Sequence, residues 1–302
     1  IFLAKIKPKA AIFFETEIWP NSIYLCKAKS IPSIVCNGRL SRKSFESYMR
    51  FNIFLRKVFS NLTLVLAQGD EDKNYFSKLG CRNVQVTGSV KFDQNLVSFK
   101  ASASKIQKFL DNPYFLAAST HEGEDEVILE AFNLIKKDYS SIKLVIVPRH
   151  PERAPNIRSL FLSMGAKSIY ESEVNTPSDI LIVQSLGILP SLYSDAELAF
   201  VGGSIVNRGG HNVIEPAIVN CPFILGENYF NFKNIVDAFI NVNATHIVKN
   251  PRDIYRIFSK IYEDQNSIKE NMIKNANKVV DKSAGATSRQ IKLIRASLTI
   301  AE

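Results

Sequence analysis

Short apolar runs alternate along the chain with longer segments whose apolar residues recur every three or four positions. The short runs predict buried strands, and the longer segments predict amphipathic helices. The expected strands are Ala10–Phe14, Ser33–Cys36, Leu62–Ala67, Val84–Val86, Phe115–Ala118, Lys143–Pro148, Asp179–Val183, Glu197–Val201, Pro222–Leu225 and Thr245–Val248. The expected helices include Ser44–Phe59, Asp70–Leu79, Gly123–Asp138, Ala154–Ser163 and Arg252–Glu263. Strands that alternate with helices in this way indicate parallel sheets in an α/β fold.

One polar segment interrupts this alternation. Residues Asp93 to about Ser104 are polar and small, which is typical of a linker between domains. The sequence therefore predicts two lobes, residues 1–97 and residues 98–302. The tail from Ser267 to Ala301 is polar and helix-prone, and we expect one or two surface helices there. Ligands of open α/β sheets bind beyond the carboxyl ends of the strands, so we expect a binding cleft between the lobes.

Composition excludes several classes of protein. The 302 residues are 46% hydrophobic and 22% charged, as in soluble globular proteins, and no apolar run reaches the ~18 residues of a membrane span. The four cysteines show no CxxC spacing, which favours reduced, buried thiols, and the four histidines lack the spacing of a metal site. The sequence also lacks a P-loop and a GxSxG nucleophile motif.

The positive charge is concentrated in the first third of the chain. Residues 1–100 contain 16 Lys and Arg against 7 Asp and Glu, whereas residues 101–302 contain 22 of each. A basic lobe beside a neutral one favours an anionic partner for the first lobe, such as nucleic acid, anionic lipid or a phosphorylated substrate. A basic surface that serves only solubility explains the charge equally well.

A glycine-rich motif follows the strand expected at Glu197–Val201. Gly202-Gly203 and Gly209-Gly210 lie between this strand and an apolar helix expected at about Val213 to Val219. A glycine loop that enters a helix is typical of phosphate sites, because bare backbone lets an anion approach the helix N–H groups. The loop also contains four polar side chains, Arg208, His211, Asn212 and Glu215. Helix capping is the alternative: Asn212 and Glu215 fit a capping box, or Glu215 is the N-cap before Pro216.

Two more motifs follow expected strands of the second lobe. In Ser119-Thr-His121-Glu-Gly-Glu, Ser119 and Glu122 fit a capping box, and the same hydroxyl and N–H groups suit a phosphate. Arg149 and His150 follow the strand Lys143–Pro148, where they are suited to a base or a diphosphate-type anion. An Arg-rich surface loop is the alternative for the second motif.

Two motifs of the first lobe also follow strands. Glu15 and Glu17 come directly after Ala10–Phe14, and residues two apart on an extended chain project to the same side. This carboxylate pair suits acid/base work, or the binding of a basic side chain or substrate hydroxyls, while a helix-capping Glu17 is the alternative. Trp19 is expected in the core. Arg39 follows Ser33–Cys36 and suits a phosphate or a carboxylate, although a helix-entry loop on a basic surface fits equally well.

Together these motifs resemble those of the 3-deoxy-D-manno-octulosonic acid (Kdo) transferases of Gram-negative bacteria. They occur in the family's order: ETEIWPN at 15–21, NGRLS at 37–41, AQGDEDKNYFSKLG at 67–80, GSVKFD at 88–93, ASTHEGED at 118–125, VPRHPER at 147–153 and FVGGSIVNRGGHNVIEPA at 200–217. The resemblance covers about residues 10 to 240. Small departures are Gly38 for the usual Ala, Gly88-Ser-Val for Gly-Asn-Leu, and Val213 for Pro.

The resemblance implies a two-domain GT-B glycosyltransferase, with its first lobe truncated. It implies an inverting transfer of Kdo from CMP-Kdo to the lipid A precursor, without a bound cofactor or catalytic metal. The second lobe would hold CMP through Ser119, His121, Arg149, His150, the 202–212 loop and Glu215. The basic first lobe would meet the phosphorylated glycolipid, rather than nucleic acid, at the cytoplasmic face of the inner membrane as a peripheral protein.

Family members also carry a longer N-terminal region, with a membrane anchor and a glycine-rich loop that bears the general-base Glu. No segment of this sequence matches that loop, so we expect this chain alone to be inactive or nearly so. Glu15, Glu17 and Arg39 would then be supporting residues of the catalytic site. The alternatives are a related GT-B enzyme such as a sugar-nucleotide epimerase, and a non-catalytic CMP-binding fragment.

Overall fold

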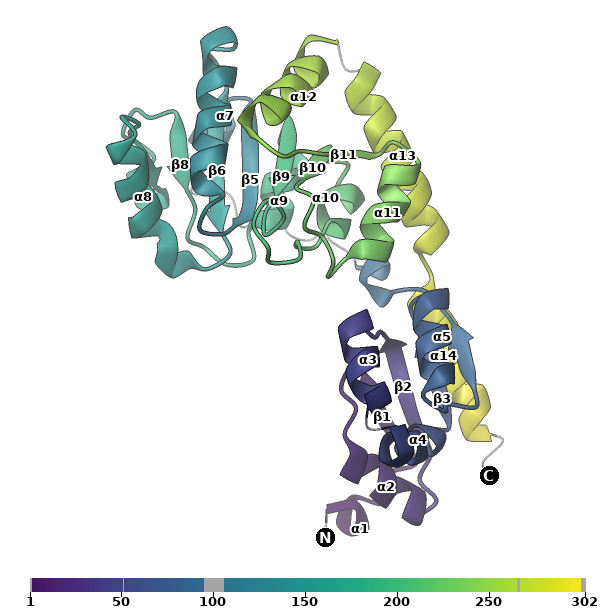
Figure 1. The fold of residues 1–302 in the computed structure, drawn as a ribbon. Coiled ribbons are helices and arrows are strands. Elements are labelled where there is room, and N and C mark those ends of the chain that lie inside the picture. The colour runs from purple at the N-terminus through teal and green to yellow at the C-terminus, as the bar shows by residue number, and fades with distance from the viewer. Residues whose placement is uncertain (1, 51, 95–105, 265–266, 300–302) are drawn as a thin grey trace. The chain divides into compact units, whose positions relative to one another are not determined.

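The chain forms two compact units (Figure 1), and the computed structural model describes residues 2–50, 52–94, 106–264 and 267–299. The first unit combines Ile1–Gln94 with Ser283–Glu302, and the second is Asn95–Lys282. The expected division at residue 97 differs from this boundary by a few residues. The expected assignment of the whole tail to the second lobe differs more, because the last residues belong to the first unit. Most of the expected linker, residues 95–104, lies outside the described residues.

The first unit is built on a parallel sheet with the order β1-β2-β3-β4. Its strands are β1 (Ala11–Phe14), β2 (Ser33–Gly38), β3 (Leu64–Ala67) and β4 (Val84–Val86). The helices of residues 2–94 are α1 (Phe2–Ile6), α2 (Pro20–Ala28), α3 (Arg42–Arg50), α4 (Asn52–Ser60), α5 (Asp70–Lys78) and the 3₁₀ turn η1 (Val90–Asp93). The single helix expected at Ser44–Phe59 is therefore two helices.

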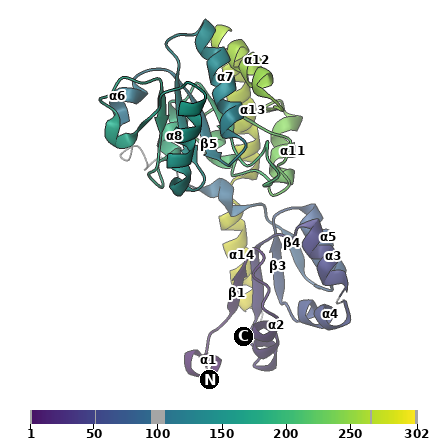
Figure 2. The ribbon, with the colours of Figure 1, turned by 60° about the vertical axis from the view of Figure 1, so that its left-hand side comes forward.

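Side chains of this sheet alternate between its two faces, and each face packs against its own apolar core. Val35 and Val65 point to one face, where they pack with Ile23, Phe59 and Phe76. On the other face, Ile34, Cys36, Leu64 and Leu66 contact Leu293 and Ile294 of α14 (Ala286–Thr299), which Figure 2 shows beside the sheet.

Hydrogen bonds fix the start of α14 to the first unit. The Asp93 carboxylate accepts from the N–H groups of Gly285 and Thr287, both at 2.6 Å. The tail was expected to form surface helices, but α14 buries its apolar side against the first sheet. The preceding helix α13 (Ser267–Ser283) buries Met272 and Ala276. Packing of α14 against the first sheet explains why the chain returns to its first unit.

The second unit has a seven-stranded parallel sheet with the order β11-β10-β9-β5-β6-β8-β7. Its strands are β5 (Tyr114–Thr120), β6 (Lys143–Pro148), β7 (Ile169–Tyr170), β8 (Ile180–Ile182), β9 (Leu198–Val201), β10 (Phe223–Leu225) and β11 (Thr245–Ile247). Its other helices are α6 (Gln107–Leu110), α7 (Asp125–Asp138), α8 (Ala154–Ser163), α9 (Leu189–Ser194), α10 (Ile214–Ile218), α11 (Lys233–Asn241), α12 (Pro251–Glu263) and the 3₁₀ turns η3 (Pro151–Arg153) and η4 (Glu171–Glu173).

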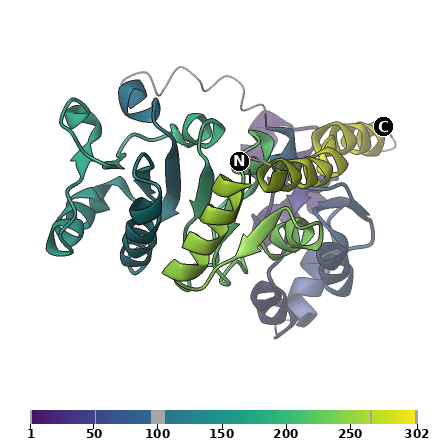
Figure 3. The ribbon, with the colours of Figure 1, turned by 90° about the horizontal axis from the view of Figure 1, so that it is seen from above.

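Helices α7, α8 and α12 share one apolar core with this sheet, and α7 packs beside α12 (Figure 3). The central strands β5, β6 and β9 are almost wholly buried, as expected for a parallel sheet covered on both faces. All four cysteines are free and buried, which confirms the prediction of buried thiols.

The strand order contains a switch point between β5 and β9. From β5 the chain adds β6, β8 and β7 on one side, and then returns to add β9, β10 and β11 on the other. At the carboxyl ends of the adjacent strands β5 and β9, the chain therefore continues toward opposite sides of the sheet. Open α/β sheets bind ligands at such a point. The register places Ala118 beside Val201, so the loops that begin near residues 119 and 202 are neighbours.

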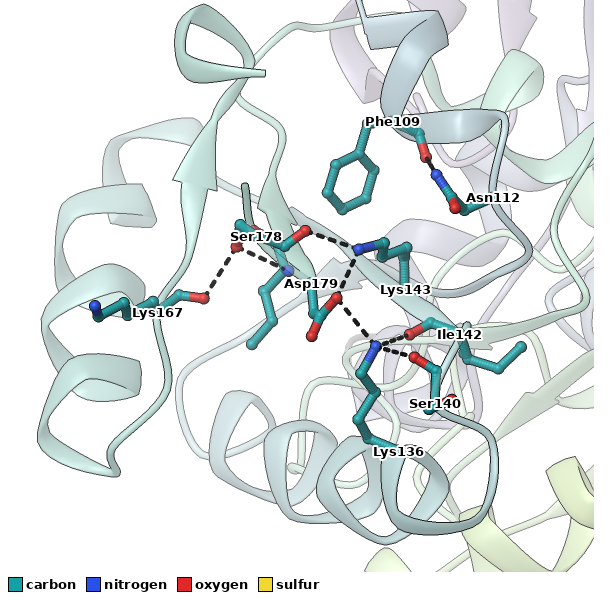
Figure 4. Close-up of polar contacts among 10 residues, drawn as sticks. Phe109, Asn112, Lys136, Ser140, Ile142, Lys143, Lys167, Ser178 and Asp179 are labelled. Atoms are coloured by element: carbon teal, nitrogen blue, oxygen red, sulfur yellow. Dashed lines mark hydrogen bonds and ion pairs between the residues drawn. The ribbon is translucent and has the colours of Figure 1, made fainter. Parts of the chain in front are cut away.

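An ionic cluster closes the opposite, amino-terminal edge of the second sheet (Figure 4). Asp179 Oδ1 accepts from Lys143 Nζ at 2.6 Å and lies 3.0 Å from Lys136 Nζ. Partial burial raises the pKa of Asp179, but hydrogen bonds from Lys143 and Lys136 outweigh it and hold that pKa below its ordinary value. The cluster ties the end of α7 to the beginnings of β6 and β8.

None of the described helices combines the length and the apolar character needed to cross a bilayer.

Candidate functional site

The glycines after β9 allow two loops to pack closely. A Cβ on Gly202 would lie 2.4 Å from the backbone oxygen of Ser119, and one on Gly203 would lie 3.0 Å from the His211 ring. Gly203, Gly209 and Gly210 all have positive φ, and a Cβ on Gly209 would lie 2.3 Å from the side chain of Asn231. Glycine is therefore required here by neighbouring protein atoms, whereas the sequence had indicated access for a ligand.

The backbone N–H groups of this loop bind a carboxylate of the protein itself. Glu124 is fully buried, and its Oε2 accepts from Gly203 N at 2.7 Å while its Oε1 accepts from Ser204 N at 2.9 Å. Ile205 N and His121 N donate to the same carboxylate, at 3.0 and 2.9 Å. The sequence predicted a phosphate at this loop, whereas these N–H groups bind Glu124 of the protein itself. The expected capping box of Ser119 and Glu122 is wrong. Helix α7 has Glu124 as its N-cap, and Ser119 has a φ of 57°.

Three histidines from three different loops gather at the switch point. His121 Nε2 lies 2.8 Å from His211 Nε2, and the His121 and His150 ring centroids are 5.9 Å apart. At 2.8 Å one ring must donate and the other accept, so the pair is compatible with neutral imidazoles. Burial lowers the pKa of His211 to about 4, and the charges of His121 and Arg149 act in the same direction. Burial also lowers the pKa of His121.

Arginines surround this histidine cluster, but they differ in availability. Arg149 N donates to Thr120 O at 3.0 Å, which fixes its backbone while its side chain remains exposed. Arg208 is also exposed, on the glycine loop. Arg153, by contrast, forms an ion pair with the buried Asp125 and donates to Thr120 O at 2.9 Å. Arg149 and Arg208 are therefore exposed arginines beside the histidines, and Arg153 has a structural role.

Glu215 lies at the start of α10, where its carboxylate accepts a hydrogen bond from Asn212. Asn212 Nδ2 donates to Glu215 Oε1 at 3.0 Å, and Ile214 N donates to Asn212 Oδ1 at 3.1 Å. Burial raises the pKa of Glu215, and the bond from Asn212 opposes this effect. The N-cap of α10 is Val213, without a side-chain cap, so both capping schemes expected for this helix are wrong.

In the first unit, a polar network joins the ends of β1 and β2. Asn37 Nδ2 donates to Glu15 Oε1 at 3.2 Å, and Lys91 Nζ lies 3.0 Å from the same oxygen. Asn37 is fully buried, accepts from Val90 N at 3.2 Å, and donates from its own N–H to Gln290 of α14 at 3.2 Å. Sequence reasoning missed Asn37, Lys91 and Gln290 as members of this network.

Glu15 and Glu17 do not form the expected pair on an extended segment. Strand β1 ends at Phe14, and Glu15 has a φ of 54° in a turn, so the two-residue period stops there. Glu17 is exposed and accepts from Trp19 Nε1 at 2.7 Å. Trp19 is 59% exposed, so its expected place in the core is also wrong.

Arg39 follows β2 as predicted, and its charge acts on Asp72. Burial raises the pKa of Asp72, while a hydrogen bond from Leu40 N and the positive charge of Arg39 oppose that shift. The basic partner of Glu15 is Lys91.

The comparison with known proteins identifies the family. A family model described as 3-deoxy-D-manno-octulosonic-acid transferase (kdotransferase) matches residues 1–94. The 3-deoxy-D-manno-octulosonic acid transferase of Haemophilus influenzae is 30% identical over 302 residues, which is 97% of this chain and 71% of that protein. The chain belongs to the Kdo transferase family. This membership supports a glycosyltransferase of lipopolysaccharide biosynthesis and confirms the resemblance inferred from the motifs.

Solved structures extend this similarity to the fold. The C-terminal CMP-Kdo binding domain of WaaA from Acinetobacter baumannii is 30% identical, with a TM-score of 0.56, over 61% of this chain and 98% of that domain. A protein of Listeria monocytogenes described as a UDP-N-acetylglucosamine 2-epimerase matches 100% of this chain and 77% of its own, with a TM-score of 0.70 at 13% identity. Similarity at that low identity concerns the fold alone, and the two-unit α/β fold is of the GT-B type.

Proposed function

We propose that this Kdo transferase family member uses its second unit to bind CMP-Kdo, the donor from which Kdo passes to the lipid A precursor. The observation that carries the proposal is the 30% identity to a CMP-Kdo binding domain. The gathering of histidines and arginines at the switch point between β5 and β9 supports it, because this is where an α/β sheet binds a nucleotide.

The side chains at this edge suit the two ends of CMP. Glu215 is a carboxylate that can accept both ribose hydroxyls, a contribution of ~1.5–3 kcal/mol for charged hydrogen bonds. The phosphate requires donors other than the N–H groups of Gly203, Ser204 and Ile205, since these already bind Glu124. We assign the phosphate of CMP to the exposed Arg149 and Arg208 together with His150. We assign its cytosine base to the surroundings of Ser119 and His121.

We further propose that the first unit meets the anionic glycolipid at the cytoplasmic surface of the inner membrane. Its charge excess supports this partner, as does a surface cavity of about 780 Å³ lined by Lys7, Lys9 and Lys29 together with apolar Leu3 and Ile31. Basic and apolar groups side by side suit a phosphorylated lipid.

The proposed transfer is inverting, uses no resident metal ion, and takes its general base from outside this chain. The contacts of Glu15 support an external general base, because its Oε1 already binds Asn37 and Lys91. Glu15, Glu17 and Arg39 would then orient the acceptor side of the site as supporting residues. Arg149 and Arg208 would supply positive charge to the leaving CMP phosphate, the role that a metal ion has in other transferases.

A transfer assay with CMP-Kdo and lipid A precursor tests this function. We expect the 302-residue chain to transfer little or no Kdo, and a version extended at its N-terminus to be active, because a positioned base supplies ~10²–10⁴-fold. Activity of the extended version should survive treatment with EDTA. Comparable turnover by the short chain would place the base within residues 1–302, with Glu17 as the first candidate. An inactive extended version that still binds CMP would favour a non-catalytic CMP-binding protein.

A further inference from the structure

We infer that Glu124 is a positioning residue that assembles the donor site as an internal anion. Its carboxylate joins the loop that follows β5 to the loop that follows β9, and so sets the separation of His121 and His211. The expected effect of Glu124 on CMP binding rests on the proposed CMP-Kdo site. Its effect on the positions of His121 and His211 does not.

The contacts of Glu124 are those of a bound anion. Its side chain is fully buried, and each carboxylate oxygen accepts two backbone N–H groups. One donor, His121, belongs to its own loop, and the other three, Gly203, Ser204 and Ile205, belong to a loop about 80 residues away. Glu124 is also the N-cap residue of the 14-residue α7, but its side chain makes no cap hydrogen bond to that helix and is used for the loops instead. Successive N–H groups of this kind otherwise form a site for an external phosphate.

The network continues from Glu124 to both histidines. His121 donates its own N–H to the carboxylate. On the other side, Gly203 N is bound by Glu124, and Gly203 O accepts from Gly210 N at 2.8 Å, one residue before His211. The 2.8 Å contact between the two imidazoles therefore depends on a chain of backbone bonds that begins at Glu124.

The neighbouring acid has a different task and provides a matched control. Asp125 is also buried, but it pairs with Arg153, whose other hydrogen bond in the described part of the chain goes to Thr120 O rather than to residues 202–211. Of these two carboxylates, Glu124 is the one that links the two loops that carry the histidines.

The test compares Glu124→Gln with Asp125→Asn in the whole chain. Substitution by Gln keeps the shape but removes the charge and turns an N–H₂ group toward backbone donors. We expect both variants to unfold at lower temperature. Only E124Q should change the side-chain ¹⁵N signals of His121 and His211, and it should weaken CMP binding by about tenfold or more.

The outcomes separate this inference from the proposed function. A lower melting temperature with unchanged histidine signals and unchanged CMP affinity in E124Q would reduce Glu124 to a structural residue and overturn the inference. Altered histidine signals in a chain whose unsubstituted form binds no CMP would retain the positioning role and reject the donor site. If E124Q fails to fold, hydrogen exchange at the backbone amides of the unsubstituted chain tests the inference instead. Slow exchange at His121, Gly203, Ser204 and Ile205 is expected, and fast exchange at these amides contradicts the inference.

Discussion

His121 and His211 lie with their Nε2 atoms 2.8 Å apart, although 90 residues separate them in the sequence. One ring can donate to the other only while the acceptor nitrogen carries no proton, so the pair is stable when at least one imidazole is neutral. The pKa of His211 is low, about 4, because burial disfavours the charged form of its imidazole. A neutral His211 is therefore favoured both by burial and by its contact with His121.

This pKa predicts how stability depends on pH. The folded value lies below the ordinary value of 6.5, so the unfolded chain binds more protons between pH 6.5 and 4. The free energy of unfolding should therefore fall as the pH drops through that window. Urea unfolding at several pH values should show a shallower fall for His211→Gln than for the unsubstituted chain. The exposed His150→Gln serves as control, and an equal fall for all three proteins would contradict the prediction.

Gly202 provides a packing test of the same site. A Cβ at this position would lie 2.4 Å from the Ser119 oxygen, and the backbone there cannot move without displacing β5. We expect Gly202→Ala to destabilise the protein by about 1–3 kcal/mol in urea unfolding, the usual cost of overpacking. Gly69→Ala is the matched control, because its Cβ would lie 3.8 Å from the nearest side-chain atom. Equal stability of the two variants would show that the loop after β9 adapts.

The network around Asn37 predicts an effect on the first unit. Asn37 has a φ of 51°, and its side chain binds both Glu15 and Val90. Asn37→Ala leaves the Val90 N–H without this acceptor and puts Ala in the left-handed region, at a cost of about 2–4 kcal/mol. Thermal unfolding checks this against the exposed Asn21→Ala. A melting temperature of N37A equal to that of N21A would show that the network contributes nothing.

The membrane proposal predicts a difference between the two units. Lys7 and Lys29 line the cavity of the first unit, whereas Lys260 and Lys274 are exposed lysines of the second. We expect K7E/K29E to reduce co-sedimentation with anionic liposomes more than K260E/K274E. Added salt should weaken binding, because exposed charges are screened within ~8 Å at physiological ionic strength. Equal losses from both double variants would reject the first unit as the membrane-facing surface.

Strands and site loops were predictable from the sequence because buried parallel strands form continuous apolar runs. Each expected strand overlaps an observed one, and the motifs with Arg39, His121, Arg149 and His211 do follow strand ends. The two-residue β7 is too short to produce such a run. The separation of α3 from α4 was missed because residues 48–52 contain neither Gly nor Pro.

Contacts between distant segments could not be predicted in the same way. Glu124 appeared to be one more acid near a helix start, and only the pairing of β5 with β9 reveals that it fills the glycine loop. The contacts of Lys91 with Glu15 and of Gln290 with Asn37 form only when the first unit folds. Local pattern determines the elements, but these partners depend on the strand order and on the return of the last helix.

Calorimetric titration with CMP tests the central claim, that the second unit holds the donor nucleotide at Glu215. We predict that CMP binds the unsubstituted chain and that Glu215→Gln weakens binding by at least ~10-fold, since 1.4 kcal/mol corresponds to a decade in affinity. The exposed Glu270→Gln should bind as the unsubstituted chain does. An unchanged affinity of E215Q for CMP would contradict the account.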